Sequence, residues 1–146
     1  MLLQRGIEQG DKHDWESAEK TFRSVLEIDP KNTHGWYNLG VVQQQNRKSR
    51  EAAASYDKAL ATDPGFTPAM YNKAIILEGT DRAGAMRLYQ QIVLLNPKAS
   101  TTYLRMGLLQ LRTGETSGAQ VSFSKAVAID PKLRDSVPKP YRPAGE

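Results

Sequence analysis

The sequence predicts an all-α fold, an α-solenoid of four helix-turn-helix repeats with eight helices in total. Four Asp-Pro or Asn-Pro dipeptides recur along the chain, and their prolines are 34, 33 and 34 residues apart. Upstream of each dipeptide, apolar residues recur at the three- and four-residue spacing of one helix face. The repeats span about 1–32, 33–66, 67–99 and 100–131, and residues 132–146 form a proline-rich C-terminal tail.

Each repeat is predicted to contain two antiparallel helices that cross closely. A small residue stands in the middle of each first helix, and an alanine followed four residues later by an aromatic side chain stands in each second helix. A bulky residue at either place would separate the pair. The small residues are Gly6, Gly40, Ala74 and Gly107, and the alanine–aromatic pairs are Ala18 and Phe22, Ala52 and Tyr56, Ala85 and Tyr89, and Ala119 and Phe123.

The expected helices span about 2–11, 14–28, 33–46, 49–62, 67–79, 82–95, 100–113 and 116–129. The residue before a proline is pushed out of the helical region, so each Asp-Pro or Asn-Pro ends a second helix. Side chains that can cap a helix start precede or begin most of these segments. The expected caps are Thr33, Thr67 and Ser100 for first helices, and Asp14, Ser49, Asp81 and Thr116 for second helices.

The tail is expected to be extended, because Pro138, Pro140 and Pro143 exclude a regular α-helix. Leu133, Val137 and Tyr141 are the nearest side chains that could cover the last helix. The same face of a second molecule could cover it instead.

The 34-residue period, with a small residue, an alanine, an aromatic residue and a proline at fixed spacing, resembles the tetratricopeptide repeat family. The resemblance covers residues 2–131. It implies a right-handed superhelix whose first helices line a concave face, with no catalytic residue and no cofactor. It also implies that a protein or peptide ligand binds along this inner groove.

The resemblance places the binding residues on the first helices, by repeat position. An apolar ladder and two equivalent asparagines stand out, because apolar side chains anchor ligands and amides can both donate to and accept from a peptide backbone. The expected groove residues are Leu3, Ile7, His34, Tyr37, Asn38, Val41, Tyr71, Asn72, Ile75, Leu104, Arg105, Leu108 and Arg112. Further positions on this face are Gln4, Asp11, Gln44, Gln45, Glu78, Thr101 and Leu111. Packing between neighbouring first helices is the alternative role of the apolar residues.

One subclass of the family holds the acidic C-termini of chaperones with a clamp of lysine, arginine and asparagine side chains. Most of the corresponding positions here are apolar or uncharged, as at Leu3, Ile7 and Pro68. This departure argues against a chaperone-tail ligand.

Composition disfavours other classes of function. The chain has no cysteine, which excludes disulfides, thiolate metal sites and cysteine nucleophiles. His13 and His34 have no partner at metal-ligand spacing, so no metal site is expected. The net charge of +4 is spread out rather than gathered in a dense basic stripe, which disfavours a nucleic-acid binder.

The sequence therefore predicts a non-catalytic interaction scaffold with a protein or peptide partner, without nucleic acid and without direct membrane insertion. Residues 1–30 carry four Lys/Arg and seven Asp/Glu, whereas the remainder is basic. Head-to-tail self-assembly, giving a homo-oligomer, is thus the alternative. A cytoplasmic location is favoured, and the soluble part of a membrane-anchored protein is left open.

Overall fold

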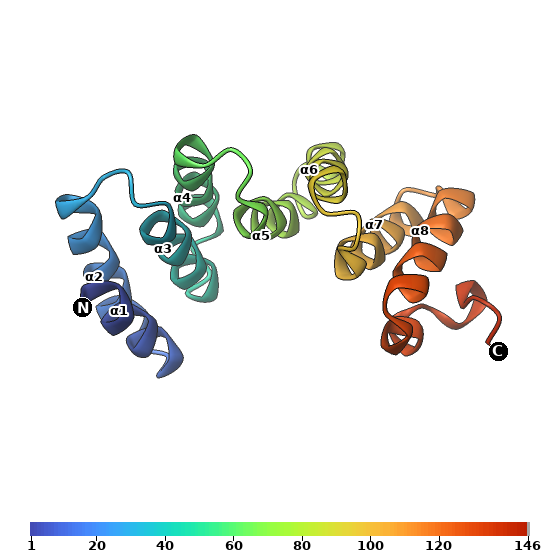
Figure 1. The fold of residues 1–146 in the computed structure, drawn as a ribbon, viewed down its shortest axis with the longest axis horizontal. Helices are drawn as coiled ribbons and strands as arrows, with labels where there is room; N and C mark the ends of the chain where they lie inside the picture. Colours follow the sequence, from blue (N-terminus) through green and yellow to red (C-terminus); the bar gives the residue numbers. More distant parts are fainter. Residues whose placement is uncertain (146) are drawn as a thin grey trace. The chain divides into compact units, whose positions relative to one another are not determined.

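The computed structural model describes residues 1–145, which contain eight α-helices, two short 3₁₀ helices and no β-strand (Figure 1). The predicted all-α class is confirmed, and every helix end lies within two residues of its expected place. The chain divides into two compact units, Met1–Ile76 and Leu77–Glu146. This division falls within the third predicted repeat, and the extent of a single four-repeat domain stays a prediction.

The first unit is built from helix pairs joined by short turns. Helix α1 (Leu2–Asp11) packs on α2 (Trp15–Ile28), and α2 packs in turn on α3 (Thr33–Gln45). Helix α3 pairs with α4 (Ser49–Thr62), and α5 (Thr67–Leu77) follows.

The second unit has the same local plan. Helix α6 (Arg82–Leu95) packs on α7 (Ser100–Arg112), and α7 pairs with α8 (Thr116–Ile129). The 3₁₀ helices η1 (Pro131–Ser136) and η2 (Lys139–Tyr141) follow and lie against α8. No helix among residues 1–145 combines the length and the apolar character that crossing a bilayer requires.

Glycine fixes how closely paired helices approach. A Cβ atom added to Gly40 would lie 2.6 Å from Cε1 of Tyr56, well inside van der Waals contact. The same conflict recurs between Gly6 and Phe22 and between Gly107 and Phe123, each at 2.5 Å. In three of the four predicted repeats, a ring from the second helix therefore fills the space above a glycine of the first.

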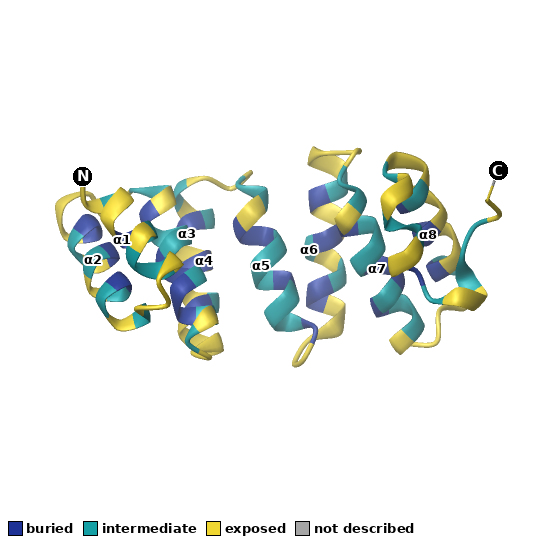
Figure 2. Cartoon of the chain, turned by 90° about the horizontal axis from the view of Figure 1, so that it is seen from below, coloured by how far each residue is buried: buried dark blue, intermediate teal, exposed yellow. Residues whose placement is uncertain are grey.

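These close crossings bury the core. The rings of Phe22, Tyr56 and Phe123 and the neighbouring alanines Ala18, Ala52 and Ala119 are buried. Figure 2 shows buried positions along the helices and largely exposed loops.

Each second helix ends in the same way. The side chains of Asp29, Asp63, Asn96 and Asp130 each accept a hydrogen bond from the backbone N–H two residues later, at 3.1–3.2 Å. The following proline stops the helix, and this Asx turn redirects the chain toward the next segment. The Asp/Asn-Pro dipeptide is thus both the period marker of the sequence and the physical helix stop.

The observed N-cap residues match the predicted ones only in part. Asp14 and Asp81 cap their helices as predicted, accepting from the N–H groups of Ser17 and Gly84. The cap of α3 is Asn32, not Thr33, because its side chain reaches the N–H of Gly35 at 2.7 Å.

Thr33 is the first residue inside α3, and its hydroxyl contacts that of Thr62 at 2.7 Å. Ser49, Ser100 and Thr116 likewise lie inside their helices and make no capping bond, so those three predicted caps are wrong. The structure gives no cap for α5, and the prediction at Thr67 stays open.

A polar bridge joins the two helices of three repeats at equivalent positions. The hydroxyl of Ser55 donates to the side-chain oxygen of Gln43 at 2.6 Å, and both side chains are buried. The hydroxyl of Thr21 donates to the side-chain oxygen of Gln9, also at 2.6 Å. The hydroxyl of Ser122 and the side-chain amide of Gln110 form the third bridge, again at 2.6 Å. In the third predicted repeat the corresponding residues are Leu77 and Leu88, so both polar partners are replaced together.

The tail covers the last helix pair of its own unit. Val137 is 1% exposed and belongs to a cluster with Ala119 and Phe123. The ring of Tyr141 lies 6.1 Å from that of Phe123, and the backbone carbonyl of Tyr141 accepts a hydrogen bond from the side-chain amide of Gln120. The prolines exclude an α-helix as predicted, but the tail forms two 3₁₀ turns rather than an extended segment.

Candidate peptide-binding face

The first unit presents nine of the predicted binding residues on its first helices. Eight of them are half-buried, whereas His34 at the start of α3 is exposed. Half-burial leaves part of each of these eight side chains exposed to solvent. The nine residues are Leu3 and Ile7 on α1, His34, Tyr37, Asn38 and Val41 on α3, and Tyr71, Asn72 and Ile75 on α5.

A hollow of about 360 Å³ opens between α1 and α3. It brings three predicted residues together, Ile7, Asn38 and Val41, beside edges of the buried Phe22 and Val42. The rest of its lining comes from Gly10, Asp11, His13, Trp15 and Gln45. An apolar floor with a few polar groups around it is typical of a ligand pocket.

His13 and Trp15 are two of the lining residues that the sequence analysis did not place on this face. His13 is exposed with a φ of 59°, and its ring meets the half-buried ring of Trp15 edge-on at 5.1 Å. A left-handed backbone at the inter-helix turn aims the imidazole at the tryptophan, and no sequence signal marks that conformation at a histidine.

Tyr37, on the same helix as Asn38 and Val41, lies in an aromatic cluster. Its ring packs edge-on against Phe66 at 5.3 Å and lies 6.0 Å from Tyr56. Its hydroxyl accepts a hydrogen bond from the amide of Asn72 at 3.4 Å. The exposed His34 also meets Phe66, at 5.3 Å. The two predicted residues Tyr37 and Asn72 are thus brought together and hold each other in place.

Tyr56 is the fully buried member of this aromatic cluster. Burial raises the pKa of its hydroxyl above the ordinary range, so the group stays protonated and donates to Gln44 at 2.7 Å. A neutral, hydrogen-bonded hydroxyl is the form that a buried site tolerates.

In the second unit three of the four predicted residues, Leu104, Arg105 and Leu108, make contacts within the unit. Leu104 and Leu108 pack against the cluster of Ala119, Phe123 and Val137. Arg112 is exposed at the end of α7. The aliphatic pair therefore has a packing role, and its part in binding a ligand stays a prediction.

Arg105 is bound by its own chain. Its guanidinium pairs with the carboxylate of the buried Glu78 and donates to the hydroxyl of Tyr89 at 3.4 Å. Burial alone would lower the pKa of Arg105, but the contacts with Tyr89 and Glu78 outweigh it, and the pKa lies above its ordinary value. A ligand at Arg105 would have to share the guanidinium with these two groups.

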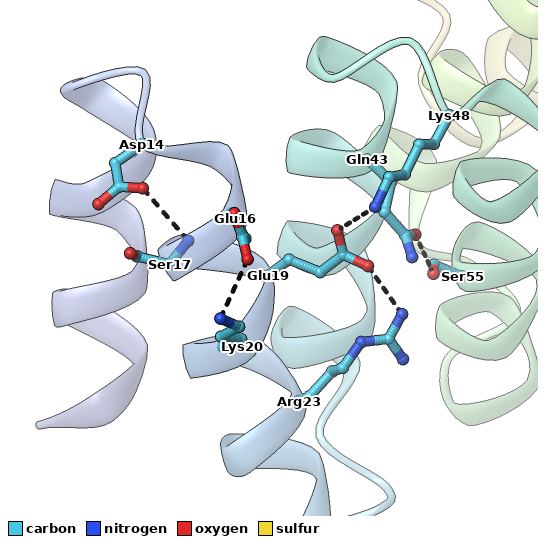
Figure 3. A network of polar contacts seen from close by, with 9 residues as sticks. All are labelled: Asp14, Glu16, Ser17, Glu19, Lys20, Arg23, Gln43, Lys48 and Ser55. Carbon is cyan, nitrogen blue, oxygen red and sulfur yellow. Dashed lines mark hydrogen bonds and ion pairs between the residues drawn. The ribbon is translucent and has the colours of Figure 1, made fainter.

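An ion-pair network ties α2 to the turn before α4 (Figure 3). Glu19, whose side chain is 12% exposed, accepts from Arg23 at 2.8 Å and from Lys48 at 2.9 Å. Burial alone would raise the pKa of Glu19, but these two cations outweigh it, and the pKa lies below its ordinary value. The network stabilises the first unit from the side of α2.

Two sequence profiles of the tetratricopeptide repeat family match the chain, at residues 3–65 and 100–133. Among curated proteins, the type IV pilus assembly protein PilF of Pseudomonas aeruginosa is 26% identical over 88% of this chain. The peroxisomal targeting signal receptor of Kluyveromyces lactis is 43% identical over 37% of it, and the human protein O-mannosyl-transferase TMTC3 is 23% identical over 82%.

This chain spans only part of those relatives: 52% of PilF, 10% of the receptor and 14% of the transferase. Solved structures show the same fold over a larger share. A crystal structure of MamA matches with a TM-score of 0.83 at 23% identity, covering 90% of this chain and 77% of MamA.

The repeated glycine–aromatic crossings, the four Asx-Pro helix stops, the two matching profiles and the shared fold agree with one another. The chain belongs to the tetratricopeptide repeat family.

Proposed function

We propose that the chain is a non-catalytic protein-interaction scaffold that binds an extended peptide segment on the first-helix face of its first unit. The hollow lined by Ile7, Asn38 and Val41 carries the proposal, because it offers apolar surface beside the amide of Asn38, for which residues 1–145 provide no side-chain hydrogen bond. Such an amide can pair with both the N–H and the C=O of a peptide backbone.

The relatives support a role in protein interaction. One is named as a receptor for a targeting signal and another as an assembly protein. A third is a transferase, of which this chain spans 14%. The proposal of a non-catalytic role rests on the helical repeats that make up the chain.

The test is selection of peptides from a random twelve-residue display library, followed by titration calorimetry with the selected peptides. We expect Asn38→Ala to weaken binding about tenfold while the circular dichroism spectrum and melting temperature stay unchanged, because loss of one or two hydrogen bonds costs about 1–1.5 kcal/mol. Lys58→Ala, on an exposed position of α4, is the matched control. Equal affinity in Asn38→Ala and the control would refute the assignment of this face.

Self-assembly is the second candidate, supported by the acidic first thirty residues and the basic remainder. The docked tail argues against self-association through the end of α8, because Val137 already packs on Ala119 and Phe123 within one chain.

A further inference from the structure

The hollow between α1 and α3 has one formally charged carboxylate in its lining, that of Asp11. Within residues 1–145, Asp11 takes part in no ion pair and no side-chain hydrogen bond, and it is exposed. Most other acidic side chains near it on α1 and α2 have partners, such as Glu8 with Gln4 and Glu16 with Lys20. The carboxylate of Asp11 thus stabilises no contact of the described fold.

Its place in α1 makes this carboxylate a cost to the folded chain. Asp11 is the last residue of the helix, where the unpaired carbonyl groups already carry partial negative charge. An acidic side chain at a helix C-terminus is repelled by that charge, whereas a basic one is favoured. A residue that is electrostatically unfavourable and internally unpaired points to a ligand that supplies the missing positive charge.

The rest of the lining is suited to the aliphatic part of a long, charged side chain. Ile7, Val41 and the half-buried ring of Trp15 offer apolar surface, and Asn38 and Gln45 offer amide oxygens as acceptors. The aliphatic stems of lysine and arginine lie along apolar surface while the charged head stays at a polar rim. A volume of about 360 Å³ holds one such side chain with its backbone, and is small for a docked helix.

The surrounding charge favours the same ligand. The first thirty residues carry a net charge of −3, with Lys12 as the cation next to Asp11 in the chain. An acidic peptide would meet repulsion from this field, and a purely apolar anchor would desolvate Asp11 without compensation.

We infer that this hollow binds a lysine or arginine side chain of the bound peptide, with the cationic head paired to Asp11 and the stem on Ile7, Val41 and Trp15. The inference rests on the proposed function, because it names the anchor residue of the peptide on the same face.

The test uses four small probes, the Nα-acetyl amides of arginine, lysine, norleucine and glutamate. Binding is followed at pH 8 by the NMR shifts of the two tryptophan indole N–H groups. Trp15 lines the hollow, whereas the indole of Trp36 donates to the carbonyl of Pro30 and serves as the internal reference. We expect the two cationic probes to shift Trp15 and leave Trp36 in place, and the glutamate probe to shift neither. The better of the two cationic probes identifies the preferred side chain.

Asp11→Asn should weaken the cationic probes about fivefold, and Glu51→Gln, which removes a charge from α4 away from the hollow, should leave them unchanged. Because Asp11 has no internal partner and its charge is repelled by the C-terminus of α1, Asp11→Asn should keep or slightly raise the melting temperature of the parent. The inference is overturned if norleucine amide binds as tightly as the cationic probes, if Asp11→Asn has no effect, or if no probe shifts Trp15.

The two proposals fail separately. If library peptides bind and Asn38→Ala weakens them while the four probes bind alike, the peptide-binding face stands and the cationic anchor is wrong. If the cationic probes bind through Asp11 and no library peptide binds, the charge preference of the hollow stands and the peptide function is wrong.

Discussion

At the scale of single residues, backbone conformation and close contact impose the strictest demands. The turn between the paired helices places a residue in the left-handed region at three equivalent positions: His13 with φ 59°, Arg47 with φ 62° and Gly114 with φ 83°. Only glycine adopts this region without steric strain, so two of the three turns carry strain that the third avoids.

Arg47→Gly should therefore stabilise the chain by about 0.5 kcal/mol, since relief of strain exceeds the added entropy of glycine in the unfolded chain. Gly114→Ala should act in the opposite direction and destabilise by about 1 kcal/mol. Urea unfolding of both variants checks the pair of signs. A loss of stability in Arg47→Gly would show that the arginine side chain matters more than its backbone angle.

Gly40→Leu should destabilise the first unit by roughly 1–3 kcal/mol or more through overpacking. The reason is the 2.6 Å between a Cβ at this position and the ring of Tyr56, which is buried and cannot move aside. Thermal melting followed by circular dichroism measures the effect, with Gly65→Ala in an open loop as the control. An unchanged melting temperature would mean that the ring relaxes without cost.

At the scale of helices, the pairing of α2 with the turn before α4 depends on pH through Glu19. The folded pKa of Glu19 is depressed, so its carboxylate contributes stability that is fully present above the ordinary glutamate pKa of about 4.3. That contribution is lost as the pH falls through the lower folded pKa.

Glu19→Gln should cost about 1 kcal/mol at pH 7, discounted because Arg23 and Lys48 are about half exposed. The difference from the parent should persist at pH 5 and shrink toward zero near pH 3. Urea unfolding at each pH measures it, with the exposed Glu27→Gln as reference. A difference independent of pH would assign the effect to packing rather than charge.

Most of the helical framework could be predicted from the sequence, because its determinants are local. Asp63-Pro64 ends α4 by geometry within three residues, and the Gly40–Tyr56 crossing repeats at a fixed spacing. The cap of α3 was not predicted correctly, because the side chains of Asn32 and Thr33 can both accept a hydrogen bond from a helix N–H. The geometry of the turn decides which of the two reaches the N–H of Gly35. The pairing of Arg105 with Glu78 joins residues 27 positions apart and has no local signal.

The predicted binding residues illustrate the same division. Repeat position predicted that Ile7, Asn38 and Val41 share one face, and the structure places all three around one hollow. The contribution of Asp11 depends on the absence of a partner, which no spacing rule reveals.

At the scale of the whole molecule, the tail decides whether the last helix pair has an exposed end. Removal of residues 132–146 should lower the melting temperature by several degrees, because it uncovers the buried Ala119 and Phe123. Val137→Ala should reproduce part of this loss, at about 2 kcal/mol, and Lys139→Ala should not.

Light scattering over a concentration series separates the two roles of the tail. We expect the truncated chain to associate at higher concentration and the parent to keep a constant mass. Equal melting temperatures and equal masses at every concentration would show that the tail covers nothing of consequence.

Limited proteolysis with trypsin can measure how firmly the tail is docked on α8. Trypsin cleaves after lysine and arginine but not where proline follows, so the bonds after Lys139 and Arg142 are resistant by chemistry alone. The remaining cleavable bonds of the tail follow Lys132 and Arg134, and both lie in η1, directly before the buried Val137. A protease needs a locally unfolded segment, so the rate of cutting at these two bonds measures how often the tail lifts away from α8.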